Sequence, residues 1–496
     1  MPESLRPGSD ARSMQATQGP HGLPSRRDFL AFTTSAIVLV GCSEVTPGPK
    51  RQAVHTVDSM LEDPVFYVAH RGSMDNWPEH TAEAYAQSLA AGARAIEISL
   101  SATADGELVC HHDLNTLRMT GVDRLIAETT LEELSKLQND ARPWLGPNSL
   151  LLPIPRLRDV LDKHAANAVI FVEDKQATNT VELLDLMDSY PESTRHFVWK
   201  QPALTDIPVE VTDRGYMTWG YLTGDDLAVA ERTPLTGVAG RYDLIGIHHS
   251  ASDDLVRTIV GLGKPVMAWE VHTRSTRDRL VSLGVRGMMC SNIPYVTAST
   301  ARNTSDVFAT GLRGDGDLPW ALAWSHQPEI SSARSSILID HKDKASYCMG
   351  SLCPITSIDH SITFEMRWPE ALPRGNDHAG VAFGQHDDSV YRVREPSASG
   401  GYHLIINRDG EFALFGRVAE AVDGYELGRA ATEPPVPGEW MSFRIDVSAD
   451  TVACTRLDGG GGTLTAHSSL YRGGYFSLCR NYYAYPPVEF RGIFVA

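Results

Sequence analysis

Short apolar runs alternate with amphipathic stretches from residue 65 to about residue 298. The runs with strand character cover residues 65–69, 95–100, 108–111, 169–173, 197–199, 216–222, 244–248, 266–271 and 287–290. Stretches with helical spacing lie between them, at residues 81–91, 181–189, 255–261 and 277–283. Repeated strand–helix units predict a parallel sheet. About eight such units over about 235 residues are typical of an α/β fold, the (β/α)8 barrel of the TIM type, which we predict over residues 63–298.

The pattern changes after residue 298. Residues 299–319 are rich in Ser, Thr, Asn, Gly and Asp, which predicts a linker. Beyond it apolar and polar positions alternate, so that one strand presents Ile362, Phe364, Met366 and Trp368 on a single face. The sequence Asn407-Arg408-Asp409-Gly410 is typical of a hairpin turn. Many short strands with turns between them predict an all-β sandwich, or jelly roll, over residues 320–496. It resembles the concanavalin-A/laminin-G type of domain.

The N-terminus has the pattern of an export signal. Arg26 and Arg27 precede an apolar run over residues 29–40, which is too short to span a membrane as a helix. The run ends in Leu39-Val40-Gly41-Cys42, which resembles a bacterial lipobox. We therefore predict a twin-arginine signal peptide over residues 1–41, a lipidated Cys42 and a tether over residues 42–62. The protein would be exported and lipid-anchored to the outer face of a membrane of the bacterial cell envelope. The alternative is a plain secretory signal with an incidental cysteine.

Charge and composition narrow the classes of partner. The 496 residues are 42% hydrophobic and 21% charged, which is ordinary for a globular protein. The formal net charge is -18, and an acidic chain without a broad basic field argues against a nucleic-acid partner. Any positive charge that binds a phosphate must therefore be local.

Export would permit disulfides. Apart from Cys42, the chain contains Cys110, Cys290, Cys348, Cys353, Cys454 and Cys479. Sequence does not fix their connectivity. Cys348 and Cys353 could close a local loop, and Cys454 and Cys479 could join strands. The other two fall in predicted barrel strands, where buried thiols are an equally good interpretation.

Charged and titratable residues gather at the ends of the first apolar runs. His70 and His112 can exchange protons near neutral pH, and the planar guanidinium of Arg71 can hold two phosphate oxygens. Glu97 ends the core of an apolar run, where a charge is costly unless it has a partner. Because barrel enzymes place their sites at the carboxyl ends of the strands, these residues predict an active site that cleaves a phosphate ester.

The order of these motifs resembles the signature of the glycerophosphodiester phosphodiesterase family. The matching pieces are His70-Arg71-Gly72, Pro78-Glu79-His80-Thr81, Glu97-Ile98-Ser99, Thr103-Ala104-Asp105-Gly106, His112-Asp113 and Glu173-Asp174-Lys175. The resemblance implies that His70 and His112 are catalytic and that Arg71 and Lys175 bind the substrate phosphate. It also implies a divalent metal, Ca2+ or Mg2+, on Glu97 and Glu173. The supporting residues would be Glu79, Ser99, Asp113 and Trp269.

Three positions depart from the family pattern. Ser99 stands where the family usually has a metal-binding Asp, His80 replaces the usual Asn, and Asn292 stands where an Asp is usual. A missing carboxylate removes a charged ligand for a hard cation. Glu97 and Glu173 could therefore form ion pairs with Lys175 or Arg71 in place of binding a metal. The position of His272, beside Trp269, fits the surface as well as the site.

The predicted function is hydrolysis of glycerophosphodiesters to an alcohol and glycerol phosphate, by histidine acid/base catalysis with metal assistance. Two alternatives stay open. One is a phospholipase-D-like activity on lysophospholipid or sphingomyelin. The other is a catalytically weak lipoprotein that binds phosphodiesters or cell-wall polymer. In either case the sandwich could bind a glycan, for which Tyr482, Tyr483 and Tyr485 are candidates.

Overall fold

The computed structural model describes residues 54–230, 235–317, 327–340, 346–483 and 485–496. The predicted signal peptide, Cys42 and most of the predicted tether lie outside these residues. The last part of the tether forms helix α1 (Val57–Glu62), which Thr56 caps and whose Val57 and Met60 are buried. In the described ranges, no helix is long and apolar enough to cross a bilayer.

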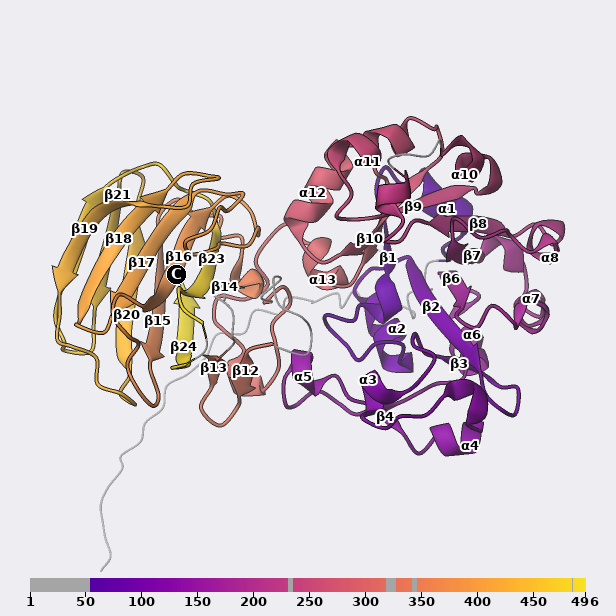
Figure 1. Cartoon of the computed structure of the whole chain (residues 1–496), viewed down its shortest axis with the longest axis horizontal. Coiled ribbons are helices and arrows are strands. Elements are labelled where there is room, and N and C mark those ends of the chain that lie inside the picture. The colour runs from indigo at the N-terminus through magenta and orange to yellow at the C-terminus, as the bar shows by residue number, and fades with distance from the viewer. Residues whose placement is uncertain (1–53, 231–234, 318–326, 341–345, 484) are drawn as a thin grey trace, which may run out of the picture. The chain divides into compact units, whose positions relative to one another are not determined.

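Eight parallel strands close into a barrel (Figure 1). They are β1 (Phe66–Ala69), β2 (Ala95–Ala102), β6 (Val169–Asp174), β7 (Phe197–Pro202), β8 (Met217–Tyr221), β9 (Leu244–His248), β10 (Val266–Val271) and β11 (Gly287–Cys290). The barrel is closed because β1 pairs with both β2 and β11. The predicted α/β barrel is thus confirmed. One of the nine predicted runs, residues 108–111, forms β3 (Leu108–Cys110), which pairs antiparallel with β2 and is not a barrel strand.

Helices connect the strands along the outside of the barrel (Figure 1). The longer ones are α2 (Ala82–Ala90), α6 (Leu157–His164), α7 (Thr180–Asp188), α11 (Asp253–Val260) and α12 (Arg274–Ser282). Shorter ones are α8 (Val209–Asp213), α9 (Leu227–Ala230), α10 (Thr236–Arg241) and α13 (Ile293–Val296). Their apolar faces pack against the strands in the larger core cluster.

One long excursion separates β2 from β6. It contains β3, α3 (Leu117–Thr120), α4 (Leu131–Leu134), α5 (Arg142–Leu145) and the small hairpin β4 (Gln138–Asn139) and β5 (Leu152–Pro153). Its apolar residues form two small clusters of their own. The excursion carries His112, so that the predicted second histidine comes from a segment outside the barrel wall.

The barrel interior has an apolar part and a charged part. Apolar side chains, among them Phe66, Phe171, Trp219, Met267 and Met289, form a packed cluster. Glu97, Glu173 and Lys200 lie toward the carboxyl ends of their strands and are also buried. Polar groups thus occupy the end at which a TIM-type barrel places its site.

Two antiparallel sheets form the C-terminal domain (Figure 1). One has the order β12 (Glu329–Ser331), β13 (Ser336–Ile339), β24 (Val488–Val495), β15 (His360–Arg367), β20 (Met441–Val447), β21 (Thr451–Arg456), β22 (Thr463–His467). The other has the order β14 (Ser346–Cys348), β23 (Tyr475–Arg480), β16 (His378–Gln385), β17 (Gly401–Asn407), β18 (Glu411–Arg417), β19 (Tyr425–Ala431). Side chains of both sheets, such as Met366 and Leu404, share one core. The predicted sandwich and the hairpin at Asn407 are therefore confirmed, whereas the concanavalin-type likeness stays a prediction.

Part of the predicted linker belongs to the sandwich. The Asp306 N–H donates to the Ile493 carbonyl over 2.9 Å, and the Ile493 N–H donates to Asp306 Oδ2 over 2.6 Å. Phe308 is buried in the sandwich core. Asp306 and Phe308 therefore belong to the sandwich domain, at its edge.

Buried polar contacts also join Asp388 of the sandwich to helix α12. The backbone N–H groups of Arg274 and Ser275 donate to the two oxygens of Asp388 over 2.6 and 2.8 Å. Tyr295 donates its hydroxyl to the same carboxylate over 2.8 Å. The Arg274 guanidinium in turn donates to the Cys353 carbonyl over 2.8 Å. A carboxylate at a helix N-terminus satisfies N–H groups that have no partner inside the helix, so Asp388 fixes the start of α12.

Among the described residues the six cysteines are free, and all are buried. Cys454 lies on β21 and Cys479 on β23, in different sheets. The predicted disulfide alternatives are therefore not confirmed. Burial raises the pKa of Cys110, Cys290 and Cys454, as expected of apolar thiols.

Candidate active site

The turn after β1 presents His70 and Arg71. It is a 3-10 turn (η1, His70–Gly72) in which Arg71 has φ +50° and Gly72 has φ +79°. A Cβ on Gly72 would lie 2.7 Å from a side-chain atom of α2, so the close approach requires glycine. His70 Nδ1 lies 3.1 Å from Ser291 Oγ and 3.7 Å from Glu270 Oε2. Burial lowers the pKa of His70 to about 4, although Glu270 opposes the shift. The ring is therefore neutral at pH 7 and can accept a proton.

Arg71 is held by a carboxylate that also binds Arg118. Glu79 Oε2 lies 3.3 Å from Arg71 Nη1, and Arg118 Nη2 donates to Glu79 Oε1 over 2.5 Å. Burial would raise the pKa of Glu79, but the two guanidinium groups hold it far below its usual range. Within the described structure, the buried Nε of Arg71 has no hydrogen-bond partner. An unpaired buried donor is costly, and a phosphate oxygen is a ligand that would pair it.

Arg118 connects this clamp to His112. His112 Nδ1 lies 2.7 Å from Asp113 Oδ1, and Arg118 Nε donates to Asp113 Oδ2 over 2.7 Å. With Nδ1–H donating to Asp113, His112 keeps Nε2 for proton transfer. Burial lowers the pKa of His112, and the charge of Arg71 contributes in the same direction to both histidines. The two predicted catalytic histidines thus lie around the same arginine.

A lysine that sequence reasoning missed lies between the two predicted metal ligands. Lys200, on β7, places its Nζ 2.6 Å from Glu97 Oε1 and 2.7 Å from Glu173 Oε2. Lys175 Nζ lies 3.1 Å from the other Glu173 oxygen. Burial would raise the pKa of both carboxyl groups, but Lys200 and the other nearby positive and hydrogen-bonding groups together outweigh it, so that the pKa of Glu173 falls to about 2 and that of Glu97 also lies well below normal. The predicted phosphate ligand Lys175 is therefore shared with Glu173.

These residues do not fit a divalent metal. The position between Glu97 and Glu173, where an ion would bind both carboxylates, holds the ammonium of Lys200. Ser99 supplies a neutral hydroxyl that donates to Glu97 Oε1 over 3.1 Å. Over the described ranges, no group of three or more His, Cys, Asp and Glu side chains is arranged to hold a metal ion. A hard cation prefers several oxygen ligands with negative charge, and a second cation at this distance repels it.

The end of β10 adds two further groups, Glu270 and His272, which meet Asp75 from the loop after η1; the sequence did not reveal the three as a unit. His272 Nδ1 lies 2.8 Å from Asp75 Oδ2, and its Nε2 lies 3.3 Å from Glu270 Oε2. Burial would lower the pKa of His272, but Asp75 and Glu270 outweigh it and raise the pKa to about 10. The surface interpretation of His272 is therefore wrong. Glu270 also lies near His70. Glu270 and His272 together therefore position His70, the predicted base. One feature of the sequence could have revealed this group: Glu270 is a charged residue inside the apolar run that forms β10.

Trp269 is placed in an aromatic wall beside these charges. Its Nε1 donates to the Leu222 carbonyl over 3.2 Å, and its ring centroid lies 5.5 Å from that of Tyr221. Tyr221 donates its hydroxyl to Glu173 Oε1 over 2.6 Å. The proposed role of Trp269 in lining a substrate cleft stays a prediction.

The two other departures from the family pattern have distinct environments. His80 Nδ1 lies 2.7 Å from the Tyr85 hydroxyl, while its buried Nε2 has no hydrogen-bond partner in the part of the chain that the structure describes. Burial lowers the pKa of His80 well below normal. Asn292 caps α13 through the N–H of Tyr295, at 3.4 Å. His80 thus lies beside the site, and Asn292 has a structural role.

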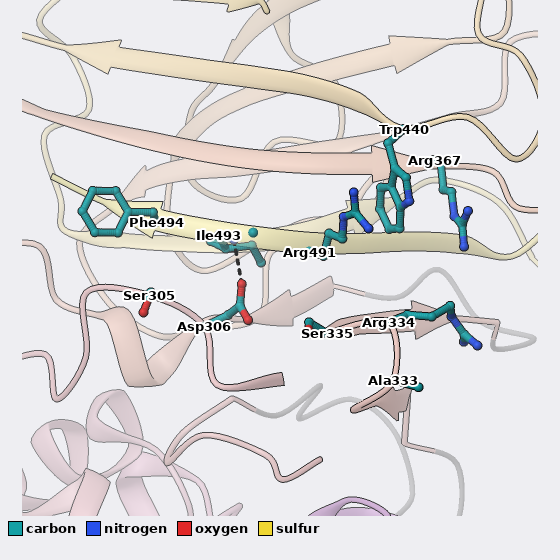
Figure 2. Close-up of a pocket in the computed structure, with 11 residues that line it drawn as sticks. Ser305, Asp306, Ala333, Arg334, Ser335, Arg367, Trp440, Arg491, Ile493 and Phe494 are labelled. Atoms are coloured by element: carbon teal, nitrogen blue, oxygen red, sulfur yellow. Dashed lines mark hydrogen bonds between the residues drawn. The ribbon is translucent and has the colours of Figure 1, made fainter. Parts of the chain in front are cut away.

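The sandwich contains none of the predicted catalytic residues. Tyr482 is buried and accepts a hydrogen bond from Trp368 Nε1, which removes it as a glycan-stacking candidate, whereas Tyr483 and Tyr485 are exposed. The sandwich has a cavity of about 780 Å³, and Figure 2 shows Arg367 and Arg491 on either side of Trp440 in its wall. Glu489 and Glu365 neutralise these arginines. The cavity has no histidine in its wall.

The chain is similar to several known phosphodiesterases. YhdW of Bacillus subtilis is 25% identical over 239 residues, which cover 45% of this chain and 93% of that protein. The glycerophosphodiester phosphodiesterase of the same organism is 33% identical over 121 residues, covering 23% of this chain and 41% of that protein. The solved glycerophosphodiester phosphodiesterase of Agrobacterium tumefaciens is 17% identical with a TM-score of 0.39, covering 47% of this chain and all of that one (100%). With its barrel and its relatives, the chain falls in the class of phosphoric diester hydrolases.

Residues 70–201 match the model of the Glycerophosphoryl diester phosphodiesterase family. The chain therefore carries a domain of this family, as the motifs predicted. The match begins at His70 and ends one residue after Lys200.

Proposed function

We propose that the protein hydrolyses glycerophosphodiesters to an alcohol and glycerol phosphate. The family domain over residues 70–201 supports the substrate class. The observation that carries the proposal is the arrangement of His70 and His112 around Arg71, whose buried Nε lacks a partner in the described structure.

The proposed first step is attack on phosphorus by the neighbouring hydroxyl of the glycerol. Neutral His70 accepts the hydroxyl proton as the new P–O bond forms. The P–O bond to the alcohol breaks, and His112, which enters this step as the imidazolium paired with Asp113, gives the leaving oxygen its Nε2 proton. Water then opens the cyclic phosphate with the two proton transfers reversed. Arg71 and Lys175 offset the negative charge on the phosphate oxygens.

No step is assigned to Ca2+ or Mg2+, because the buried donor set holds Lys200 between its two carboxylates. Glu97 instead accepts the backbone N–H of Arg71 over 2.9 Å. It thereby fixes the turn that presents both Arg71 and His70.

Product analysis of glycerophosphocholine turnover tests the function. The proposal predicts choline and glycerol phosphate in equal amounts; phosphorus NMR identifies the glycerol phosphate and proton NMR the choline. Turnover of lysophosphatidylcholine or sphingomyelin, without turnover of glycerophosphocholine, would favour the phospholipase-D-like alternative. Saturable binding without turnover of any of these diesters would favour the binding lipoprotein.

The cellular location is a separate proposal that rests on the sequence of residues 25–42. We propose export and lipidation of Cys42, so that the protein is anchored at the outer face of the membrane. Cys42→Ser should move the protein from the membrane fraction to the soluble fraction without changing turnover. If the variant stays in the membrane fraction, the anchor assignment fails. A glycan ligand at Tyr483 and Tyr485 stays a prediction.

A further inference from the structure

The position of Lys200 follows from the order of the barrel strands. β6 pairs with β2 on one side and with β7 on the other. Ser99 of β2 is in register with Glu173 of β6, and Val172 of β6 is in register with Trp199 of β7. Glu97, Glu173 and Lys200 therefore come from three adjacent strands, and their buried side chains meet inside the barrel.

The ammonium of Lys200 makes close contacts with both carboxylates. Its Nζ lies 2.6 Å from Glu97 Oε1 and 2.7 Å from Glu173 Oε2. It also lies 5.2 Å from the ring centroid of Tyr221 and 5.7 Å from that of Trp219, close enough for a cation–π interaction. Although burial alone would lower the pKa of Lys200, Glu173 and Glu97 raise it. The lysine therefore remains charged in its buried position.

The charges of the cluster balance without a metal. Glu97 and Glu173 are matched by Lys200 and Lys175. An Asp at position 99 would add a negative charge that Ser99 lacks. Compared with a site that has Asp at position 99 and a neutral side chain at position 200, Ser99 and Lys200 together make this site more positive by two charges. This difference equals the charge of a divalent ion. Adding Ca2+ or Mg2+ would leave that charge uncompensated in a buried site.

Resting on the phosphodiesterase function proposed above, we propose that the Lys200 ammonium takes the place of a divalent metal between Glu97 and Glu173, so that turnover needs no metal. Lys200 is then a positioning residue. It holds Glu97, which in turn accepts the backbone N–H of Arg71. Ser99 completes the arrangement with a hydroxyl that donates to Glu97 and brings no additional charge.

Metal binding by itself provides the first test. Calorimetric titration of chelator-treated wild type with Ca2+ and with Mg2+ should show no saturable binding tighter than about 1 mM. The Ser99→Asp/Lys200→Met double variant should bind Ca2+ at least about tenfold more tightly, because it gains a carboxylate and loses the cation. Ser99→Asp/Lys163→Met is the matched control, because Lys163 is exposed on α6. This control should bind Ca2+ more weakly than Ser99→Asp/Lys200→Met. Equal affinity in both would overturn the role of Lys200.

Turnover of glycerophosphocholine provides the second test. Wild-type turnover after exhaustive chelation should stay within about twofold of the untreated rate, whereas a metal-assisted reaction would fall far more. The double variant should be inactive in chelator and recover with Ca2+. A loss of more than about tenfold in chelated wild type, restored by Ca2+ or Mg2+, would overturn the proposal.

The metal-binding and turnover measurements together distinguish a failure of this proposal from a failure of the proposed function. If wild type turns over no diester in either condition, the function fails, and the calorimetric comparison still tests the replacement. If Lys200→Met prevents folding because it removes the ammonium between two buried carboxylates, both wild-type measurements remain decisive. Tight, saturable Ca2+ binding by wild type that Glu97→Gln abolishes would overturn the proposal without any lysine variant.

Discussion

The carboxyl end of the barrel and the interior of the sandwich bury opposite kinds of side chain. Between the two sheets lie apolar residues such as Phe364, Leu404 and Phe443, which stabilise the domain in proportion to the area removed from water. The barrel instead buries Glu97 and Lys200 against one another. Buried ion pairs are weak contributors to stability and are costly when one partner is removed. The difference indicates that the barrel charges are there for binding and chemistry, whereas the sandwich core serves stability.

The largest expected effect is loss of turnover without loss of folding. His70→Ala and His112→Ala should each lower kcat on glycerophosphocholine by about 10²- to 10⁴-fold, because each removes one proton transfer. Circular dichroism and the melting temperature should change little. His467→Ala, at an exposed position on β22, is the control and should keep the wild-type rate. Near-normal turnover in either site variant would remove the two-histidine mechanism.

The reverse outcome is expected in the sandwich core. Leu404 is fully buried, so Leu404→Ala should lower the free energy of unfolding by about 2–5 kcal/mol through a cavity. Urea unfolding followed by fluorescence measures this change. At 25 °C the folded variant should keep its kcat. A large fall in kcat at unchanged stability would mean that the interior of the sandwich affects the chemistry directly.

Asp388 is where the two regions meet, and it should produce a mixed effect. Asp388→Ala leaves the N–H groups of Arg274 and Ser275 without their acceptor, which should cost about 1–3 kcal/mol. Because α12 begins directly after the segment that carries Glu270 and His272, kcat should also fall, by less than about tenfold.

Thermal unfolding and glycerophosphocholine kinetics measure the two effects of Asp388→Ala separately. Asp450→Ala, at an exposed position of the sandwich, is the control. If the stability of Asp388→Ala falls and its kcat does not, the sandwich supports the fold of the barrel without positioning the site.

The last prediction concerns pH and stability. The pKa of His272 is raised to about 10 in the folded state, above the ordinary value of about 6.5 for an unfolded chain. Its contribution to stability is therefore complete below pH 6.5 and is lost as the pH rises through 10. Urea unfolding of wild type between pH 7 and pH 10 should show a steeper decline than that of His272→Gln. If the free energy of unfolding depends on pH equally in wild type and His272→Gln, then Asp75 and Glu270 do not stabilise the protonated form of His272.

Local patterns determined the elements and the first half of the site. Each barrel strand corresponds to an apolar run, because burial on both faces requires continuous apolar residues. His70, Arg71 and His112 were recognisable because they follow such runs in a set order. The run at β3 was misassigned to the barrel for the same reason, since an apolar run does not reveal whether its neighbour is parallel or antiparallel.

The tertiary structure decided which charges are partners. Lys200 and Glu97 are 103 residues apart and pair with one another, and Arg118 reaches both Glu79 and Asp113. The sequence identified the carboxylates but left a metal, Lys175 and Arg71 as their alternative partners. Electrostatic energy depends on distance and burial, and both are set only when β2, β6 and β7 lie side by side. The chain by itself thus determined the fold and the histidines, whereas closure of the barrel placed a lysine where a metal was expected.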